Sequence, residues 1–208
     1  MKKILCFGDS NVYGFNPKNG QRYSKDCRWS GILQSSCKNK YDIIEAGCNN
    51  RTCFKDNPAG IEQTGYKILP TILSETKPNS IILALGINDL QFQYNTTPTE
   101  IELGLTNIIK TTQKICPNAK IIILSPSNIK KCILQSFFSA MFDQTSIELS
   151  KQMSKIYKNV ADTQNCLFLD LNKIATTSDI DGLHYTIDEH KKIAQKVFEF
   201  IDNHENLL

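Results

Sequence analysis

Short runs of apolar and β-branched residues alternate along this chain with longer segments in which apolar residues recur at helical spacing. The runs predicted to form strands are residues 3–7, 42–46, 80–85, 120–124 and 166–169. Those at 80–85 and 120–124 are almost continuously apolar, as expected for parallel strands covered on both faces. This alternation predicts a three-layer α/β/α domain around a doubly wound parallel sheet.

The segments between and after these runs have helical apolar spacing. They are residues 29–37, 66–75, 99–115, 143–161 and 187–204. Thr99-Glu100, and Thr186 with Glu189, are interpreted as helix starts of the capping-box kind. The chain shows no repeat, low-complexity tract or linker, so we expect residues 1–208 to form a single domain.

Composition excludes several classes of protein. Apolar residues make up 40% and charged residues 22%, and the net charge of +3 is spread over dispersed lysines, which does not indicate a nucleic-acid partner. No segment approaches the roughly 20 apolar residues of a membrane span. The apolar run behind Lys2-Lys3 is shorter than the roughly 7–15 residues of a signal peptide, so a cytoplasmic protein is expected. The 8 cysteines form no C-x-x-C pair and are interpreted as reduced, without structural zinc or disulfides.

Polar residues follow the predicted strands at the places where a doubly wound fold binds its ligands. The first strand leads into Gly-Asp-Ser at 8–10, the second into Gly47, and the third into Asn88. Asp181 and His184 come just before the last predicted helix. Each cluster alone also fits an ordinary turn or helix cap, but their order and placement together indicate an active site.

A serine hydroxyl becomes a nucleophile when a base takes its proton and a third group orients that base. Of the 3 histidines, His190 and His204 fall inside the last predicted helix. His184 lies on a loop with Asp181 three residues before it, so the carboxylate can reach Nδ1–H and leave Nε2 facing Ser10. Ser10, His184 and Asp181 are therefore predicted to be catalytic.

The tetrahedral intermediate of such a reaction needs hydrogen-bond donors for its oxyanion. The predicted donors are the backbone N–H groups of Ser10 and Gly47 and the side-chain amide of Asn88. Asp9 is expected to brace the turn that carries Ser10. No metal or cofactor is expected, because no cluster of ligands and no glycine-rich phosphate loop is visible.

Four motifs in this order resemble the SGNH (GDSL-type) hydrolases, whose blocks centre on Ser, Gly, Asn and His. They are "FGDSNVYG", "EAGCNNRT", "LGINDLQ" and "DGLHYT". The segments "RWSGIL", "DNPAG" and "TTSDIDGLHYT" are further similar to the bacterial arylesterase/acyltransferase branch. The resemblance implies a flavodoxin-like five-stranded sheet, the same catalytic and oxyanion residues, and homo-oligomers that narrow the active-site entrance.

The substrate pocket is predicted from the resemblance and from nearby aromatic residues. Asn11 stands where these enzymes have the leucine of GDSL, and the tryptophan common after the first loop in this branch is missing. Tyr13, Phe15 and Trp29 are expected to line the pocket, although Trp29 also suits packing of its helix. The Arg51-Thr52 pair is expected to hold the loop after Gly47.

The function predicted is hydrolysis of short-chain acyl esters through an acyl-enzyme, with possible acyl transfer to alcohols. The partner is a small-molecule ester, and the apolar segment 129–142 predicts a homo-oligomer. A carbohydrate O-acetylesterase and a non-catalytic carbohydrate-binding or scaffold domain remain open alternatives. Three other classes fit less well. A metallophosphoesterase needs several histidines, and only His184 is well placed. A flavodoxin-like cofactor binder needs more glycines than Gly8-Asp9-Ser10 offers, and a phosphoryl-accepting receiver would leave His184 without a role.

Overall fold

The computed structural model describes residues 1–37 and 40–204 and contains a five-stranded parallel sheet in the order β2-β1-β3-β4-β5. The strands are β1 (Lys2–Gly8), β2 (Tyr41–Gly47), β3 (Ser80–Ala84), β4 (Lys120–Ser125) and β5 (Leu167–Asp170). Each strand boundary lies within one residue of its prediction. The predicted doubly wound α/β/α fold is confirmed.

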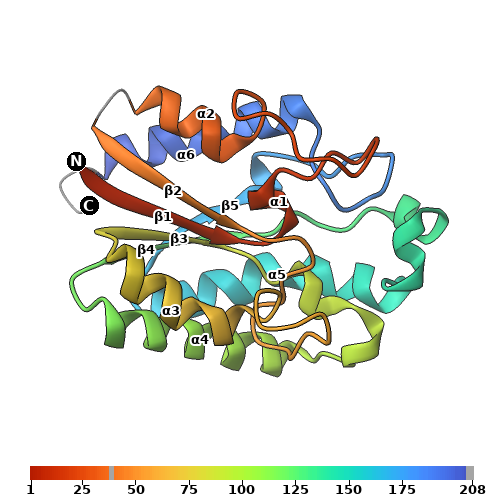
Figure 1. The fold of residues 1–208 in the computed structure, drawn as a ribbon. Helices are drawn as coiled ribbons and strands as arrows, with labels where there is room; N and C mark the ends of the chain where they lie inside the picture. The colour runs from red at the N-terminus through yellow and green to blue at the C-terminus, as the bar shows by residue number, and fades with distance from the viewer. Residues whose placement is uncertain (38–39, 205–208) are drawn as a thin grey trace.

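Helices cover both faces of this sheet (Figure 1). They are α1 (Ser10–Tyr13), α2 (Trp29–Ser36), α3 (Gly65–Thr76), α4 (Pro98–Ile115), α5 (Gln144–Thr163) and α6 (Ile187–Asn203). The short 3₁₀ helices are η1 (Ile87–Leu90), η2 (Phe92–Tyr94), η3 (Lys131–Gln135), η4 (Phe137–Ala140) and η5 (Leu171–Lys173). Figure 1 shows α2 and α6 on one face and α3, α4 and α5 on the other.

Each face of the sheet has its own apolar core. Along β1, Leu5 and Phe7 belong to the cluster that includes residues of α3, α4 and α5, whereas Ile4 and Cys6 belong to the cluster under α2 and α6. All four side chains are fully buried. Burial on both faces explains why the central strands β3 and β4 are almost continuously apolar rather than alternating.

Two helix starts differ in detail from the prediction. The capping box of α4 is formed by Thr97 and Glu100, two residues before the predicted Thr99. Thr97 Oγ accepts a hydrogen bond from Glu100 N at 3.3 Å, and Glu100 Oε2 accepts one from Thr97 N at 2.9 Å. Thr186 is the N-cap of α6 but makes no side-chain cap bond, and Glu189 Oε2 accepts the backbone N–H of Thr176 at 3.0 Å instead of completing a capping box.

The strands deliver their following loops to one end of the molecule, away from both termini (Figure 1). That end carries the segments that follow β1, β2 and β3 and the loop before α6. Within residues 1–37 and 40–204, no helix combines the length and apolar character that a membrane crossing requires.

Candidate active site

Ser10 lies in the sharp turn between β1 and α1. Asp9 is the N-cap of α1, and its Oδ1 accepts a hydrogen bond from Asn11 N at 2.9 Å. Gly8 has no room for a side chain, since a Cβ there would lie 2.3 Å from the carbonyl oxygen of Ala84. These contacts fix the direction in which Ser10 leaves the strand. Burial raises the pKa of Asp9 to about 7.

Ser10, His184 and Asp181 form a continuous hydrogen-bonded chain, although Ser10 and His184 are 174 positions apart in sequence. His184 Nε2 lies 2.9 Å from Ser10 Oγ, and His184 Nδ1 lies 2.7 Å from Asp181 Oδ2. The other carboxylate oxygen of Asp181 accepts the backbone N–H groups of Leu183 and His184, each at 3.0 Å. Such a chain can take the proton of a serine hydroxyl onto the imidazole.

Asp181 is held in its charged form. Burial acts to raise its pKa, but the hydrogen bond and charge of His184 and the two backbone N–H groups hold it below its usual range. A carboxylate in this position fixes the histidine tautomer with its proton on Nδ1, which leaves Nε2 free to accept.

Two aromatic rings enclose the imidazole. The Phe15 ring centroid lies 4.2 Å from that of His184, and the Phe138 centroid lies 5.1 Å from it. His184 itself is only 2% exposed. The base is therefore positioned by packing as well as by Asp181.

Within the described part of the chain, Ser10, Asn50 and Asn88 each have an N–H group that is available for a hydrogen bond. Asn88 Nδ2 donates one hydrogen to Arg51 O at 3.0 Å, which leaves its second N–H available. Among the described residues, the backbone N–H groups of Ser10 and Asn50 make no hydrogen bond. Ser10, Asn50 and Asn88 all line the same cleft, so their donors are available to a bound ligand.

Gly47, whose backbone N–H was predicted to be an oxyanion donor, does not line the cleft over Ser10. It packs instead against α1, where a Cβ would lie 2.2 Å from Tyr13 N. Asn50 lines the cleft and has a left-handed φ of 61°. Asparagine tolerates this conformation better than most residues, and this is the one sequence signal that could have identified position 50.

A buried network holds the loop that carries Asn50. Arg51 Nη1 donates to the carbonyl oxygens of Gly8 at 3.1 Å and Ala46 at 2.5 Å, tying the loop to the ends of β1 and β2. The Asp89 carboxylate accepts the backbone N–H groups of residues 53–55 at 2.5–2.9 Å. The structure thus places Arg51 in the loop-holding position that the sequence indicated.

The cleft over Ser10 is small, with a volume of about 170 Å³. It is lined by Ser10, Phe15, Asn49, Asn50, Asn88, Phe138, Met141, Leu183 and His184. Of the four side chains predicted to line a substrate pocket, only Phe15 does so here.

The other three predicted pocket residues have structural contacts outside this cleft. Trp29 is buried and its Nε1 donates to Asn11 O at 3.0 Å, which ties α2 to the Ser10 turn. Asn11 Nδ2 donates to Leu183 O at 3.3 Å. The Arg22 guanidinium lies over the Tyr13 ring, with Cζ 4.7 Å from the ring centroid. Asn11 and Tyr13 lie on α1 and Trp29 is the first residue of α2, and none of the three lines the cleft over Ser10. Sequence order alone does not reveal this.

Comparison with known proteins agrees with this geometry. The family model described as the GDSL-like lipase/acylhydrolase family matches residues 6–191. The chain belongs to this family.

Solved structures similar to this GDSL-like chain include a carbohydrate acetylesterase from Sinorhizobium meliloti, 27% identical, with a TM-score of 0.91 over 98% of this chain and 99% of that one. The aryl esterase of M. smegmatis is 24% identical, with a TM-score of 0.89 over 98% and 99% of the two chains. TesA is 19% identical, with a TM-score of 0.68 over 100% of both. The last two likenesses show the fold alone. The comparison with curated proteins gives no match.

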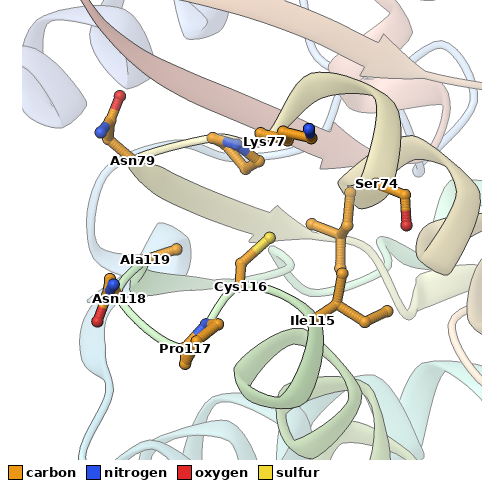
Figure 2. A pocket seen from close by; sticks show the side chains of 10 residues that line it. Ser74, Lys77, Asn79, Ile115, Cys116, Pro117, Asn118 and Ala119 are labelled. Carbon is orange, nitrogen blue, oxygen red and sulfur yellow. The ribbon is translucent and has the colours of Figure 1, made fainter.

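A larger hollow of about 400 Å³ lies at the opposite end of this GDSL-like domain, where α3 and α4 lead into β3 and β4 (Figure 2). Its titratable lining residues are Lys77 and Cys116, and burial raises the pKa of the Cys116 thiol. Ser74 also lines it, with its hydroxyl bonded to Pro70 O at 2.9 Å. The Ser74 hydroxyl thus donates to a backbone carbonyl of its own helix, whereas the Ser10 hydroxyl contacts an imidazole.

The described part of this GDSL-like chain contains no group of three or more His, Cys, Asp or Glu side chains arranged to hold a metal ion. The cysteines are all free thiols. The candidate site therefore consists of the Ser10–His184–Asp181 chain, the available N–H donors of the residues that line the cleft, and the aromatic wall of that cleft.

Proposed function

We propose that this protein is a serine esterase that hydrolyses short-chain acyl esters through an acyl-enzyme on Ser10. The observation that carries the proposal is the chain of hydrogen bonds from Ser10 Oγ through His184 to Asp181, at 2.9 and 2.7 Å. Membership of the GDSL-like lipase/acylhydrolase family supports it.

In this mechanism His184 Nε2 takes the proton of Ser10 as Oγ attacks the ester carbonyl carbon. The imidazolium then gives that proton to the departing alcohol, and the acyl group stays on Ser10. A water molecule deprotonated by the same nitrogen releases the acid and restores the hydroxyl. Asp181 stabilises the imidazolium in both halves of the reaction and keeps the ring in position.

The oxyanion hole we propose differs from the one predicted from the sequence. Its donors are the N–H groups of Ser10 and Asn50 and the second side-chain N–H of Asn88, all at the cleft. The backbone N–H of Asn50 is proposed as a donor instead of that of Gly47. Donors of this kind act where the negative charge develops and contribute more in the transition state than in the ground state.

The cleft favours small acyl groups. Its volume is about 170 Å³, and its apolar lining comes from Phe15, Phe138, Met141 and Leu183. This space suits an acetyl group better than a long chain. The carbohydrate acetylesterase at 27% identity supports acetylated sugars as a second candidate substrate class.

Acyl transfer to an alcohol is the second candidate outcome of the same acyl-enzyme. Phe15 and Phe138 enclose the base that must deprotonate the acceptor, with ring centroids 4.2 and 5.1 Å from His184. An apolar surrounding favours a small alcohol over bulk water at that nitrogen. Gas chromatography with an acetyl donor and a primary alcohol in buffer should detect a new ester, and acid release alone would indicate a plain hydrolase.

The Ser10→Ala variant tests the main proposal. Turnover of p-nitrophenyl acetate should fall by several orders of magnitude, because the nucleophile is lost. A serine-directed phosphonate should add its mass to a peptide containing Ser10, and not to the variant. Full activity in Ser10→Ala, or a label on another serine, would contradict the mechanism. Inactivity of the natural chain on aryl, alkyl and sugar acetates would favour a non-catalytic carbohydrate-binding domain.

A further inference from the structure

The side chain of Gln91 connects two of the proposed oxyanion donors from behind the cleft. Gln91 is only 1% exposed and follows η1, one turn after Asn88. Its Nε2 donates to Asn50 Oδ1 at 2.7 Å and to Asn88 Oδ1 at 3.4 Å. Its Oε1 accepts a hydrogen bond from Gln93 Nε2 at 3.0 Å, which determines which end of the amide faces the site.

Asn50 depends on this contact for its orientation. Its left-handed φ of 61° is an uncommon conformation for a residue with a side chain. Its carbonyl oxygen accepts a hydrogen bond from Asn57 Nδ2 at 2.7 Å, and its side-chain oxygen accepts one from Gln91 at the same distance. With both groups held, the direction of the Asn50 backbone N–H is fixed as well.

Asn88 is held in a similar way. Its Nδ2 donates one hydrogen to Arg51 O at 3.0 Å, and its Oδ1 accepts from Gln91. These two bonds fix the amide plane and direct the second N–H to the cleft. An amide whose oxygen accepts a hydrogen bond is also a stronger donor through its nitrogen, because hydrogen-bonded groups polarise one another.

We propose that Gln91 is a positioning residue for ester turnover, holding Asn50 and Asn88 so that both present an N–H to the oxyanion. The inference rests on the proposed function. Gln91 lies outside the cleft lining and acts on the reaction only through these two residues. It supplies no proton and forms no bond to the substrate.

The Gln91→Leu variant removes the donor while keeping a side chain of similar volume. Loss of a whole oxyanion donor lowers kcat by roughly 10²–10³-fold. Because both donors remain but lose their support, we expect kcat for p-nitrophenyl acetate to fall about 10- to 100-fold. KM should change by less than about threefold, since the contacts affected matter mainly in the transition state.

A matched control separates this effect from general destabilisation. Gln34 also uses both ends of its amide, donating to Tyr41 O at 3.1 Å and accepting from Ile43 N at 2.7 Å, and it lies on α2 away from the cleft. Gln34→Leu should lower the Tm with kcat within about twofold of the natural chain. Kinetics are measured well below both melting transitions, so that only folded protein contributes.

The Asn50→Gly variant tests whether Gln91 acts through Asn50. If Gln91 had only a general structural role, the effect of Gln91→Leu on kcat would be the same with and without this substitution. Glycine accepts the left-handed φ and keeps the backbone N–H, but it removes the oxygen that Gln91 holds. In this background Gln91→Leu should lower kcat several-fold less than in the natural chain, because the shared contact is already gone. Equal fold losses in both backgrounds would overturn the proposal.

The two proposals fail in distinguishable ways. If Ser10→Ala abolishes turnover but Gln91→Leu retains the kcat of the natural chain, only the positioning role of Gln91 is rejected. If KM rises and kcat stays constant, Gln91 contributes to substrate binding and the proposal is again wrong. If the natural chain turns over no ester and takes no phosphonate label, the esterase proposal fails, and this inference fails with it.

Discussion

His190 is a buried histidine that the proposed reaction does not use. It is fully buried, and its Nδ1 accepts the backbone N–H of Trp29 at 3.3 Å. The ring proton therefore sits on Nε2, which has no partner among the described residues. The rings of Tyr23 and Tyr185 lie 5.5 and 5.8 Å away. Burial first, and the neighbouring His184 second, lower the pKa of His190 to about 3.

This lowered pKa predicts a pH-dependent contribution to stability. The unfolded chain binds a proton at position 190 below about pH 6.5, whereas the folded chain stays neutral there until about pH 3. The neutral His190 therefore costs the free energy of unfolding nothing above about pH 6.5. As the pH falls from 6.5 toward 3, the free energy of unfolding decreases by up to about 1.4 kcal/mol per pH unit. Urea unfolding of the natural chain and His190→Gln from pH 7 to 4 should show the natural chain losing stability faster.

The same substitution at His204, near the end of α6, is the control for that measurement. A stability difference between the natural chain and His190→Gln that stays constant across this range would contradict the prediction.

At the residue scale, the sequence predicted which side chains meet at the site better than it predicted which backbone N–H groups lie there. Ser10, Asp181, His184 and Asn88 meet as expected, because each is the polar residue at a strand end or before the last helix. Gly47 was predicted to be an oxyanion donor, whereas the structure has Asn50 at the cleft with a φ of 61°. A backbone angle of this kind cannot be read from the order of residue types. No residue pattern revealed Gln91, since its partners come from two separate loops.

At the scale of elements, apolar periodicity was sufficient to predict the strands. Burial on both faces leaves few polar residues within them, so their ends are marked sharply by Gly8, Gly47 and Asp170. The start of α4 was less well predicted. Pro98 lies in the first turn of α4 and Thr97 is its N-cap. The N-cap therefore lies two residues before Thr99, where the start was predicted.

The contact between β2 and α1 gives a prediction for Gly47. A Cβ there would lie 2.2 Å from Tyr13 N and 2.6 Å from Val12 C, so the Gly47→Ala variant must push α1 away from the sheet. Ser10 moves with α1. We expect kcat/KM to fall at least about 10-fold, together with a loss of about 1–3 kcal/mol in the free energy of unfolding.

Gly104→Ala is the matched control for this prediction. Its Cβ would meet the Phe54 side chain at 2.2 Å, on α4 and outside the cleft lining. It should lower stability and leave kcat/KM of the folded enzyme within a few-fold of the natural value. Equal losses of activity in both variants would show that Gly47 has no specific relation to Ser10.

At the scale of the whole molecule, an exposed aromatic residue lies close to the candidate site. Phe137 on η4 is 83% exposed, and its ring packs edge-on against Phe138 at 5.7 Å. Phe138 in turn contacts His184. Ile129, Ile133 and Phe142 of the apolar segment 129–142 are buried within the domain, so Phe137 is the side chain of that segment through which a second copy would make contact. The homo-oligomer, the single domain over residues 1–208 and the cytoplasmic location stay predictions.

Light scattering tests the oligomer directly. We expect a mass above the 23.5 kDa of one chain at micromolar concentration. Phe137→Lys should shift the mass toward 23.5 kDa, and Leu103→Lys, at a residue 59% exposed on α4, should not. A mass of 23.5 kDa for the natural chain at all concentrations would rule the oligomer out.

The separation of Ser10 from its base along the chain has a consequence for synthesis. The two residues are 174 positions apart, and translation adds about 5–20 residues per second. The nascent chain therefore carries Ser10 for about 9 to 35 seconds before His184 is added. During that interval Ser10 is an ordinary alcohol without a base. A ribosome that stalls before adding His184 therefore holds a polypeptide whose Ser10 cannot attack an ester with the help of that histidine.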